Sequence, residues 1–124
     1  MLSVKNLSIS FKTDSGLNQV INSISYSLKK NQILGIVGES GSGKSVSSLA
    51  ILGLLPKKQT KITGEILFED ENLILLNNKQ FQNIRGNQIS IIFQEPMSSL
   101  NPSLTCGYQV QEILLQHKHS SKTA

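Results

Sequence analysis

The chain has 124 residues, of which 12 are Lys or Arg and 8 are Asp or Glu, giving a net charge of +4 at pH 7. This length suits one small domain, and a content of 38% hydrophobic and 16% charged residues is typical of a globular protein. Arg85 is the only arginine and the lysines are spread out, so we expect no nucleic-acid binding. No apolar stretch approaches the ~18 residues of a membrane span, and the single Cys106 excludes an internal disulfide.

The first third of the chain has the pattern of a hairpin. Residues 2–11 and 19–28 partly alternate apolar and polar side chains, which predicts two half-buried strands joined by a turn at residues 13–16. A second turn, at residues 29–32, leads directly into the sequence Ile-Leu-Gly-Ile-Val at residues 33–37. This short apolar run contains β-branched residues and predicts a buried parallel strand.

The next eight residues, 38–45, read Gly-Glu-Ser-Gly-Ser-Gly-Lys-Ser and match the phosphate-binding pattern G-x-x-x-x-G-K-[ST]. Backbone N–H groups can surround a triphosphate only where no side chain blocks the approach, which explains the glycines. We expect Lys44 to reach the β- and γ-phosphates and the Ser45 hydroxyl to ligate Mg²⁺. The residues expected to hold ATP are Gly38, Glu39, Ser40, Gly41, Ser42, Gly43, Lys44, Ser45 and Val46.

The context of the loop supports this interpretation over a surface turn that happens to be rich in glycine. Apolar residues at helical spacing follow the loop and predict a helix that begins near Gly43 and ends at Pro56. A strand, a glycine loop and a helix in this order are what the motif requires. The sequence therefore predicts a nucleotide site.

The second half of the chain continues the alternation of strands and helices. Residues 63–68 predict a strand with a turn after it, and residues 73–85 predict a short helix. Residues 89–93 predict a second buried parallel strand that ends at Gln94. Ligands of open parallel sheets bind beyond the carboxyl ends of the strands, so we expect Gln94 to lie near the phosphates.

The last part begins with a loop that contains two prolines. Thr105 then predicts the N-cap of a helix, although Tyr108 stands where a glutamate would complete a capping box. The polar tail, about residues 118–124, is expected to be frayed. We interpret His119 in this tail, and His117 directly before it, as solvated.

Read together, these motifs resemble the ATP-binding subunit of ABC transporters. More narrowly, the chain is similar to the peptide-importer group, which takes up dipeptides, oligopeptides and nickel. Residues 37–46, 49–56 and 93–102 carry the resemblance, and the last of these, Phe-Gln-Glu-Pro-Met-Ser-Ser-Leu-Asn-Pro, is the most specific. The implied fold is an α/β P-loop NTPase of the ABC-transporter type, with an antiparallel β hairpin subdomain and parallel core strands.

The resemblance also implies roles for two residues outside the loop. Phe11 falls where the family places an aromatic that stacks on adenine; a core position in the first strand is the alternative, because its parity matches Leu7 and Ile9. Gln94 matches the glutamine that meets Mg²⁺ or the attacking water, and a polar strand end is the alternative. By this resemblance Lys44 and Gln94 act in catalysis, and Ser45 and Gln94 hold the metal.

Several parts of the family pattern have no match in residues 1–124, which we therefore interpret as an incomplete ATP-binding domain, its N-terminal half. These parts are the signature sequence, the acidic Mg²⁺ ligand, the catalytic glutamate and the switch histidine. We expect the chain alone to be inactive as an ATPase and only marginally folded. The alternative is a nucleotide-binding remnant without turnover. A soluble P-loop enzyme of another kind, such as a GTPase or a small-molecule kinase, is disfavoured because no N-K-x-D motif occurs and because the segment around Gln94 fits the transporter pattern closely.

In the complete protein, the resemblance implies ATP hydrolysis that drives import of peptides or related small solutes. The implied cofactors are ATP and Mg²⁺. The implied partners are the transmembrane permease subunits, a second ATP-binding subunit and, indirectly, an extracytoplasmic solute-binding protein. Since the N-terminus also lacks the apolar region of a signal peptide, we expect a peripheral location on the cytoplasmic side of the plasma membrane.

Overall fold

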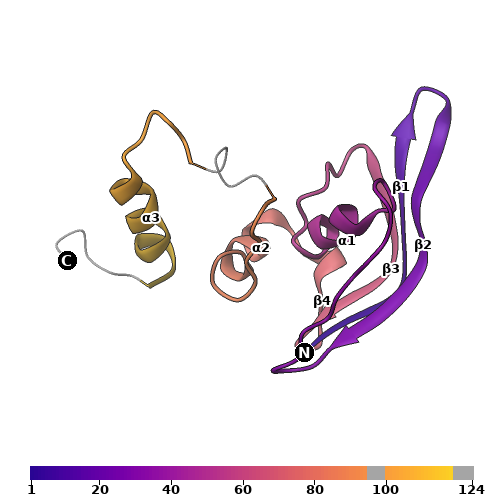
Figure 1. Ribbon diagram of the computed structural model, residues 1–124, viewed down its shortest axis with the longest axis horizontal. Helices are drawn as coiled ribbons and strands as arrows, with labels where there is room; N and C mark the ends of the chain where they lie inside the picture. Colours follow the sequence, from indigo (N-terminus) through magenta and orange to yellow (C-terminus); the bar gives the residue numbers. More distant parts are fainter. Residues whose placement is uncertain (95–99, 119–124) are drawn as a thin grey trace. The chain divides into compact units, whose positions relative to one another are not determined.

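The computed structural model describes residues 1–94 and 100–118 (Figure 1). The chain forms two compact units, Met1–Asn77 and Asn78–Ala124, and each is described here by itself. Our prediction of a single incomplete domain over residues 1–124 is not tested by this division and stays a prediction. Glu95–Ser99 of the most specific motif and the tail from His119, predicted to be frayed, lie outside the described residues.

The first unit is built on a four-stranded antiparallel sheet with the strand order β2-β1-β3-β4. The strands are β1 (Leu2–Thr13), β2 (Gly16–Leu28), β3 (Thr60–Phe68) and β4 (Glu71–Asn72). The hairpin and the strand predicted at residues 63–68 are therefore confirmed, with β1, β2 and β3 each somewhat longer than expected.

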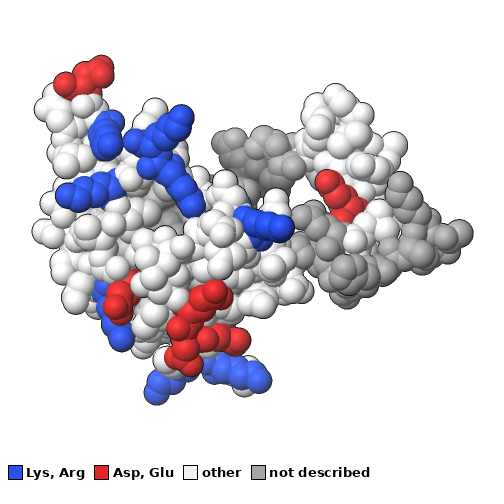
Figure 2. Space-filling model, turned by 180° about the vertical axis from the view of Figure 1, so that it is seen from behind, with Lys and Arg blue, Asp and Glu red and all other residues white. Residues whose placement is uncertain are grey.

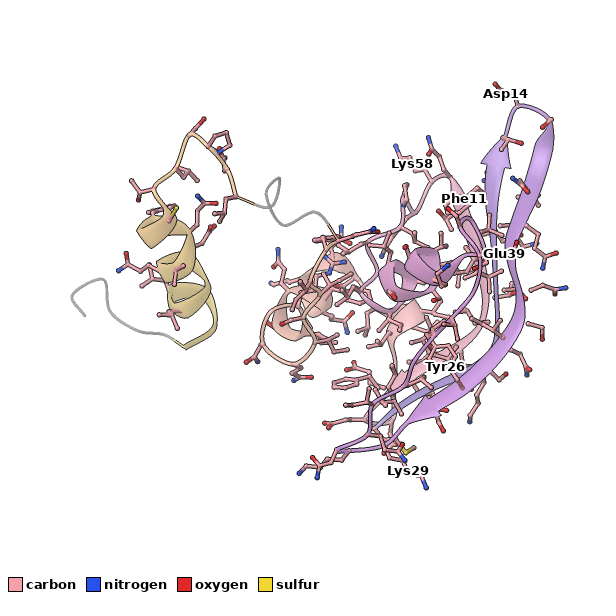
Figure 3. All side chains as sticks on the ribbon, viewed as in Figure 1. Phe11, Asp14, Tyr26, Lys29, Glu39 and Lys58 are labelled. Atoms are coloured by element: carbon pink, nitrogen blue, oxygen red, sulfur yellow. The ribbon has the colours of Figure 1, made fainter. Side chains whose placement is uncertain are left out.

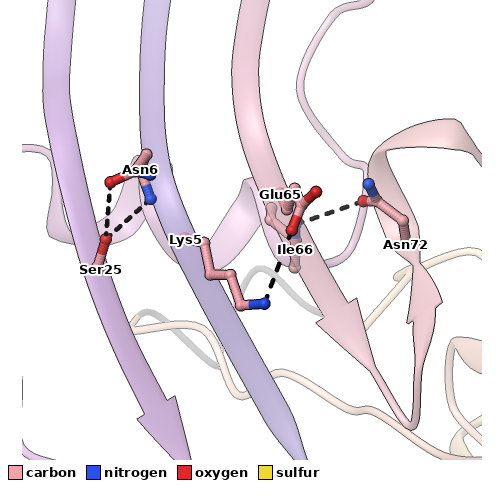
Figure 4. Close-up of polar contacts among 6 residues, drawn as sticks. All are labelled: Lys5, Asn6, Ser25, Glu65, Ile66 and Asn72. Atoms are coloured by element: carbon pink, nitrogen blue, oxygen red, sulfur yellow. Dashed lines mark hydrogen bonds and ion pairs between the residues drawn. The ribbon is translucent and has the colours of Figure 1, made fainter.

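Bulges in the first two strands decide which side chains enter the core. Asn6 in β1 and Ser23 in β2 both have φ of 49°, and the strand register shifts beside each of them. Each strand supplies a serine to the bulge of the other: Asn6 N donates to Ser25 Oγ at 2.8 Å (Figure 4), and Ser23 N donates to Ser8 Oγ at 2.9 Å. The bulged N–H groups thus keep hydrogen-bond partners where the regular ladder is interrupted.

The core of the first unit lies between the sheet and the helix α1 (Lys44–Ile51), which sits against the concave face of the sheet (Figure 1). Because of the bulge at Asn6, Val4 and Leu7 face the same side although they are an odd number of residues apart. The buried hydrophobic side chains of this unit are Val4, Leu7, Ile9, Ile21, Ala50, Leu52, Leu55, Ile66, Leu73 and Leu76.

The helix α1 ends earlier than its sequence predicts. Gly53 takes φ of 60°, its N–H bonds Ala50 O at 3.0 Å, and Leu54 N bonds Leu49 O at 2.9 Å. This pair of bonds is a Schellman motif, which satisfies the last carbonyls of a helix and turns the chain away. The predicted end at Pro56 is therefore wrong, because the glycine terminates the helix first.

The helix predicted over residues 73–85 is also wrong, since this region forms two short helices. A 3-10 turn, η1 (Leu73–Leu75), is capped by Asn72, whose Oδ1 accepts from Ile74 N at 3.2 Å. Leu76 is then extended, with ψ of 143°, and the helix α2 (Asn78–Ile84) begins after it. Leu73 and Leu76 are buried in the first unit, and this anchoring interrupts a continuous helix.

The two parallel core strands predicted at residues 33–37 and 89–93 are not formed. Ile33, Val37 and Ile92 are 102%, 97% and 95% exposed, and the second segment makes only one isolated bridge, between Arg85 and Ile89. A parallel strand requires a neighbour that completes its hydrogen-bond ladder. Within the described residues no strand lies beside either segment, so their apolar side chains stay exposed.

The second unit contains α2 and the helix α3 (Cys106–Lys118). In α2, Phe81 and Ile84 are buried, and the Arg85 guanidinium lies 4.7 Å from the Phe81 ring centre. The predicted N-cap of α3 is confirmed, because Thr105 Oγ1 accepts from Tyr108 N at 3.3 Å. Within the described ranges, no helix is both long and apolar enough to cross a membrane.

Candidate functional site

The phosphate-binding loop predicted at residues 38–45 lies against the second strand of the hairpin. Gly41 and Gly43 have φ of 81° and 90°, a left-handed conformation that favours glycine. A Cβ atom on Gly43 would lie 2.9 Å from Ile21 Cγ1 and 3.2 Å from Val20 O. A glycine is thus required at position 43 for two reasons: its left-handed backbone conformation and the close approach of the loop to β2.

Lys44 folds back over the loop and holds it together. Its Nζ donates to Gly38 O at 2.7 Å, to Glu39 O at 2.6 Å and, more weakly, to Ser42 Oγ at 3.4 Å. A lysine ammonium has three N–H donors, and here all three point into the loop. The long bond to Ser42 is the easiest to exchange, so the ammonium can turn one donor to a phosphate oxygen while two keep the loop closed.

The N-terminus of α1 supplies further donors. The helix begins at Lys44, no side chain caps it, and its first helical bond runs from Ser47 N to Gly43 O at 2.9 Å. The N–H groups before Ser47 therefore lack helical partners, and the helix dipole adds positive potential at the same place. A pocket of about 130 Å³ lined by residues 41–46 opens at this end, so the site is built for an anion.

A second pocket, of about 280 Å³, lies between the loop and β2. Val20, Ile21 and Ile24 from β2 form an apolar wall, and Gly38, Gly43 and Lys44 form the polar side. An apolar wall beside a cationic loop suits a ligand with both an uncharged part and an anionic part.

The serines that follow the loop divide into two kinds. Ser47 Oγ donates to Lys44 O at 2.7 Å and Ser48 Oγ to the same oxygen at 3.3 Å, so both hydroxyls are engaged within the helix. Ser45 is exposed, and among the described contacts its hydroxyl has no partner. An uncommitted hydroxyl at the phosphate end of the helix fits the expected Mg²⁺ ligand. Nowhere in residues 1–94 and 100–118 do three or more His, Cys, Asp or Glu gather as metal ligands.

The two remaining predicted site residues, Phe11 and Gln94, lie in different units of the chain. Phe11 lies in β1, opposite Asn18 and Thr60, on the face that carries Ile9 (Figure 3). Ile9 is fully buried and Phe11 only half-buried, so part of its ring stays open to a ligand. Gln94 is exposed and belongs to the second unit, whereas the loop belongs to the first. Its proximity to the phosphates stays a prediction.

Three residues that support the site escaped the sequence analysis. Ile21 contacts Gly43, and Ser47 is 2% exposed on the inner side of α1. The Tyr26 hydroxyl is buried on the side of the sheet that faces α1 (Figure 3). Tyr26 Oη has no hydrogen-bond partner within the described residues, and burial raises the pKa of this phenol, an effect that the nearby Ser47 side chain partly opposes. The position of Ser47 three residues after Lys44, on the inner side of a helix, was the available signal.

Comparisons with known proteins agree with this geometry. The family model described as "ABC transporter" matches residues 21–123. The dipeptide transport ATP-binding protein DppD of Bacillus subtilis is 50% identical over 125 residues, covering 100% of this chain and 37% of that protein. The oligopeptide transport ATP-binding protein OppD of the same organism is also 50% identical, covering 100% of the chain and 35% of that protein. The chain thus spans little more than a third of the length of these relatives.

Among solved structures, the chain is similar to MJ0796, a bacterial ABC transporter cassette whose dimeric structure is known. The TM-score is 0.82 at 26% identity, covering 100% of this chain and 50% of the cassette. A post-hydrolysis state of MJ0796 bound to ADP and Pi matches with the same TM-score at 25% identity, covering 99% of this chain and 51% of that one. These two structures confirm the predicted α/β fold class of the ABC-transporter ATPase type, whereas its two parallel core strands are not formed within the described residues.

Proposed function

Because this chain belongs to the ABC transporter family, we propose that its loop at residues 38–45 binds ATP together with Mg²⁺. The observation that carries the proposal is the position of Lys44, whose ammonium is held over the loop by Gly38 O and Glu39 O. This arrangement fixes a positive charge beside the free N–H groups of α1, where the terminal phosphates of a nucleotide would lie.

Each residue of the site has a separate task in this proposal. The backbone of residues 38–43 surrounds the phosphates, Lys44 binds the β- and γ-phosphates, and Ser45 holds the metal with its exposed hydroxyl. Phe11 stacks on adenine with the open part of its ring. When bound, Mg²⁺ neutralises part of the phosphate charge. Gln94 completes the metal site and orients the attacking water in the assembled protein.

We propose that the complete protein hydrolyses ATP to drive import of peptides or related small solutes. The support is the identity of the two relatives, which are ATP-binding proteins for dipeptide and oligopeptide transport. In this proposal the protein lies on the cytoplasmic side of the plasma membrane as a peripheral subunit. It assembles there with permease subunits and a second ATP-binding subunit, and a solute-binding protein delivers the solute from the other side.

Isothermal titration calorimetry of the purified chain with ATP, with and without Mg²⁺, tests the nucleotide site. Lys44→Ala should abolish binding, because it removes the charge and opens the loop. Lys30→Ala is a matched control, since this exposed lysine lies in the turn after β2 and outside the loop. Ser45→Ala should leave binding of free ATP intact and remove the additional affinity that Mg²⁺ provides.

Phosphate release measured on the same samples separates binding from turnover. We expect Lys44-dependent binding without release, because the family motifs that hold Mg²⁺ and position the attacking water have no match in residues 1–124. Release that depends on Lys44 would show that a water-positioning group is present. Equal binding by the wild type and Lys44→Ala would contradict the proposed site.

A further inference from the structure

Four exposed lysines gather around the end of the sheet where Phe11 lies. Phe11 pairs with Thr60 and Ser10 with Lys61, while Lys12 N donates to Gln59 O at 2.8 Å. The lysines of this basic patch are Lys12, Lys57, Lys58 and Lys61. Figure 2 shows lysine side chains gathered below the hairpin tip, and Figure 3 places Lys58 beside Phe11.

The basic patch has little opposing charge. Among the described residues, the ion pairs lie at the other end of the sheet, where Lys5 Nζ meets Glu65 Oε2 and the N-terminus meets Glu69 Oε1, each at 3.9 Å. No carboxylate in the described parts of the chain pairs with a patch lysine; Lys57 Nζ donates instead to Leu76 O at 3.2 Å. Asp14 stands apart at the hairpin tip (Figure 3), and Glu39 is the acidic residue of the loop itself.

Charge is therefore distributed unevenly along the sheet. Glu65, Glu69, Asp70 and Glu71 lie at the end where Leu2 pairs with Phe68 and Leu28, but Lys5, Lys29, Lys30 and the N-terminus lie there too, so the charges at that end balance. The basic patch, at the end where Phe11 pairs with Thr60, is not balanced in this way, so an approaching anion is attracted to that end. The attracting end is the one that carries the aromatic ring proposed to bind adenine.

The register of the strands sets the distance between the basic patch and the loop. Ile9 pairs with Ile21, which contacts Gly43, and Lys12 lies three residues beyond Ile9. Three residues span about 10 Å along β1 and the neighbouring strand β2 lies about 5 Å away, so Lys12 is on the order of 10–15 Å from the loop. The Debye length is ~30 Å at 0.01 M ionic strength and ~3 Å at 1 M, so the field of the patch reaches the loop at low salt and not at high salt.

We propose that the basic patch steers nucleoside triphosphates to the loop and so raises their association rate. This inference rests on the proposed function, and it assigns the patch a role during encounter, not in the bound complex. A free triphosphate carries about four negative charges and its Mg²⁺ complex about two, so steering acts more strongly on the free form. The dissociation rate depends on short contacts at the loop and does not involve the patch.

Stopped-flow fluorescence with a fluorescent ATP analogue measures both rates directly. Lys58→Gln/Lys61→Gln removes two charges from the basic patch, and Lys29→Gln/Lys30→Gln removes two charges from the turn after β2, at the opposite end of the sheet (Figure 3). The two variants have the same net charge, so any difference between them reports the position of the charges. At about 10 mM ionic strength we expect the patch variant to associate roughly threefold to tenfold more slowly than the control variant.

The salt dependence of association and the dissociation rate give two further tests of steering. At about 300 mM salt all variants should associate at the same rate, and dissociation should be unchanged throughout. Equal association rates of the two variants at low salt would overturn steering, and so would a patch effect confined to dissociation. Lys44→Ala separates the two proposals: if wild type and Lys44→Ala bind alike, the nucleotide site itself is wrong and steering is lost with it.

Discussion

Gly43 and Ile21 lie in direct contact, so the phosphate-binding loop rests on the hairpin. A Cβ atom on Gly43 would come within 2.9 Å of Ile21 Cγ1, and Ile21 is itself buried against Ile9 of the neighbouring strand. Both residues belong to the first unit, in which β2 packs against the loop. The shape of the proposed nucleotide site therefore depends on the packing of a strand that carries none of the phosphate-binding motif.

This contact predicts that Gly43→Ala destabilises the first unit more than Gly41→Ala does. Both glycines have positive φ, which costs alanine about 1–2 kcal/mol. At Gly41 the added methyl meets nothing within 4 Å, whereas at Gly43 it meets Ile21 and Val20 O, an overlap that adds about 1–3 kcal/mol. The midpoint of urea unfolding, followed by circular dichroism, should be lowest for Gly43→Ala; equal midpoints would show that the contact is not restrictive.

The paired bulges of the hairpin give a second prediction. Ser25→Ala removes the oxygen that accepts from Asn6 N, and the interrupted ladder offers that N–H no other partner except water. Since this site is exposed, we expect a loss of about 0.5–1 kcal/mol in the free energy of unfolding. Ser27→Ala in the same strand is the control, because no hydrogen bond of its side chain is described. Equal effects in urea unfolding would contradict a role for Ser25 in the bulge.

The buried phenol of Tyr26 leads us to predict that the free energy of unfolding falls at alkaline pH. Burial raises the pKa of its phenol above 10.0, so the folded state holds the proton more tightly than the unfolded state does. The resulting contribution to stability is fully present below pH 10 and is lost as the pH rises through the folded pKa. Tyr26→Phe should remove this part of the loss of stability at alkaline pH.

At neutral pH, Tyr26→Phe should change the unfolding midpoint little, because Tyr26 Oη has no partner within the described residues. Urea midpoints at pH 7 and pH 11 provide the measurement, and Tyr108→Phe, which alters an exposed phenol of the second unit, is the control. A wild type and a Tyr26→Phe variant that lose stability in parallel above pH 10 would contradict this assignment.

The exposed apolar segments predict marginal and poorly cooperative folding of the chain alone. Ile92→Ser should leave the thermal transition unchanged and reduce aggregation, because Ile92 is 95% exposed, whereas Ile66→Ser should unfold the sheet from its buried centre. We expect a broad thermal transition by circular dichroism. A sharp transition that Ile92→Ser abolishes would mean that this segment is packed in solution.

Local chemistry made the loop predictable. The proposed roles of Lys44 and Ser45 follow from their places in a short motif, and the left-handed glycines follow from the need for close backbone approach. The ends of β1 and β2 were likewise close to their predicted positions, because alternation and turn residues act over a few neighbours. Such features need no knowledge of distant parts of the chain.

The bulges and the basic patch could not be predicted in the same way. The register shifts in β2 turn Ile21 inward, and the left-handed Ser23 that accompanies them gives no signal in the sequence. Lys12 and Lys58 are far apart in the chain, and only the pairing of β1 with β3 brings them to one end of the sheet.

The sequence by itself thus determined the phosphate-binding motif, the family and the order of most elements. Only the tertiary structure decided where α1 ends, that Gly43 rests on Ile21, and that residues 33–37 and 89–93 form no strand within the described chain. The reason is physical: the conformation of a loop is set mainly by its own backbone, whereas a strand exists only when another segment completes its hydrogen bonds and covers its faces.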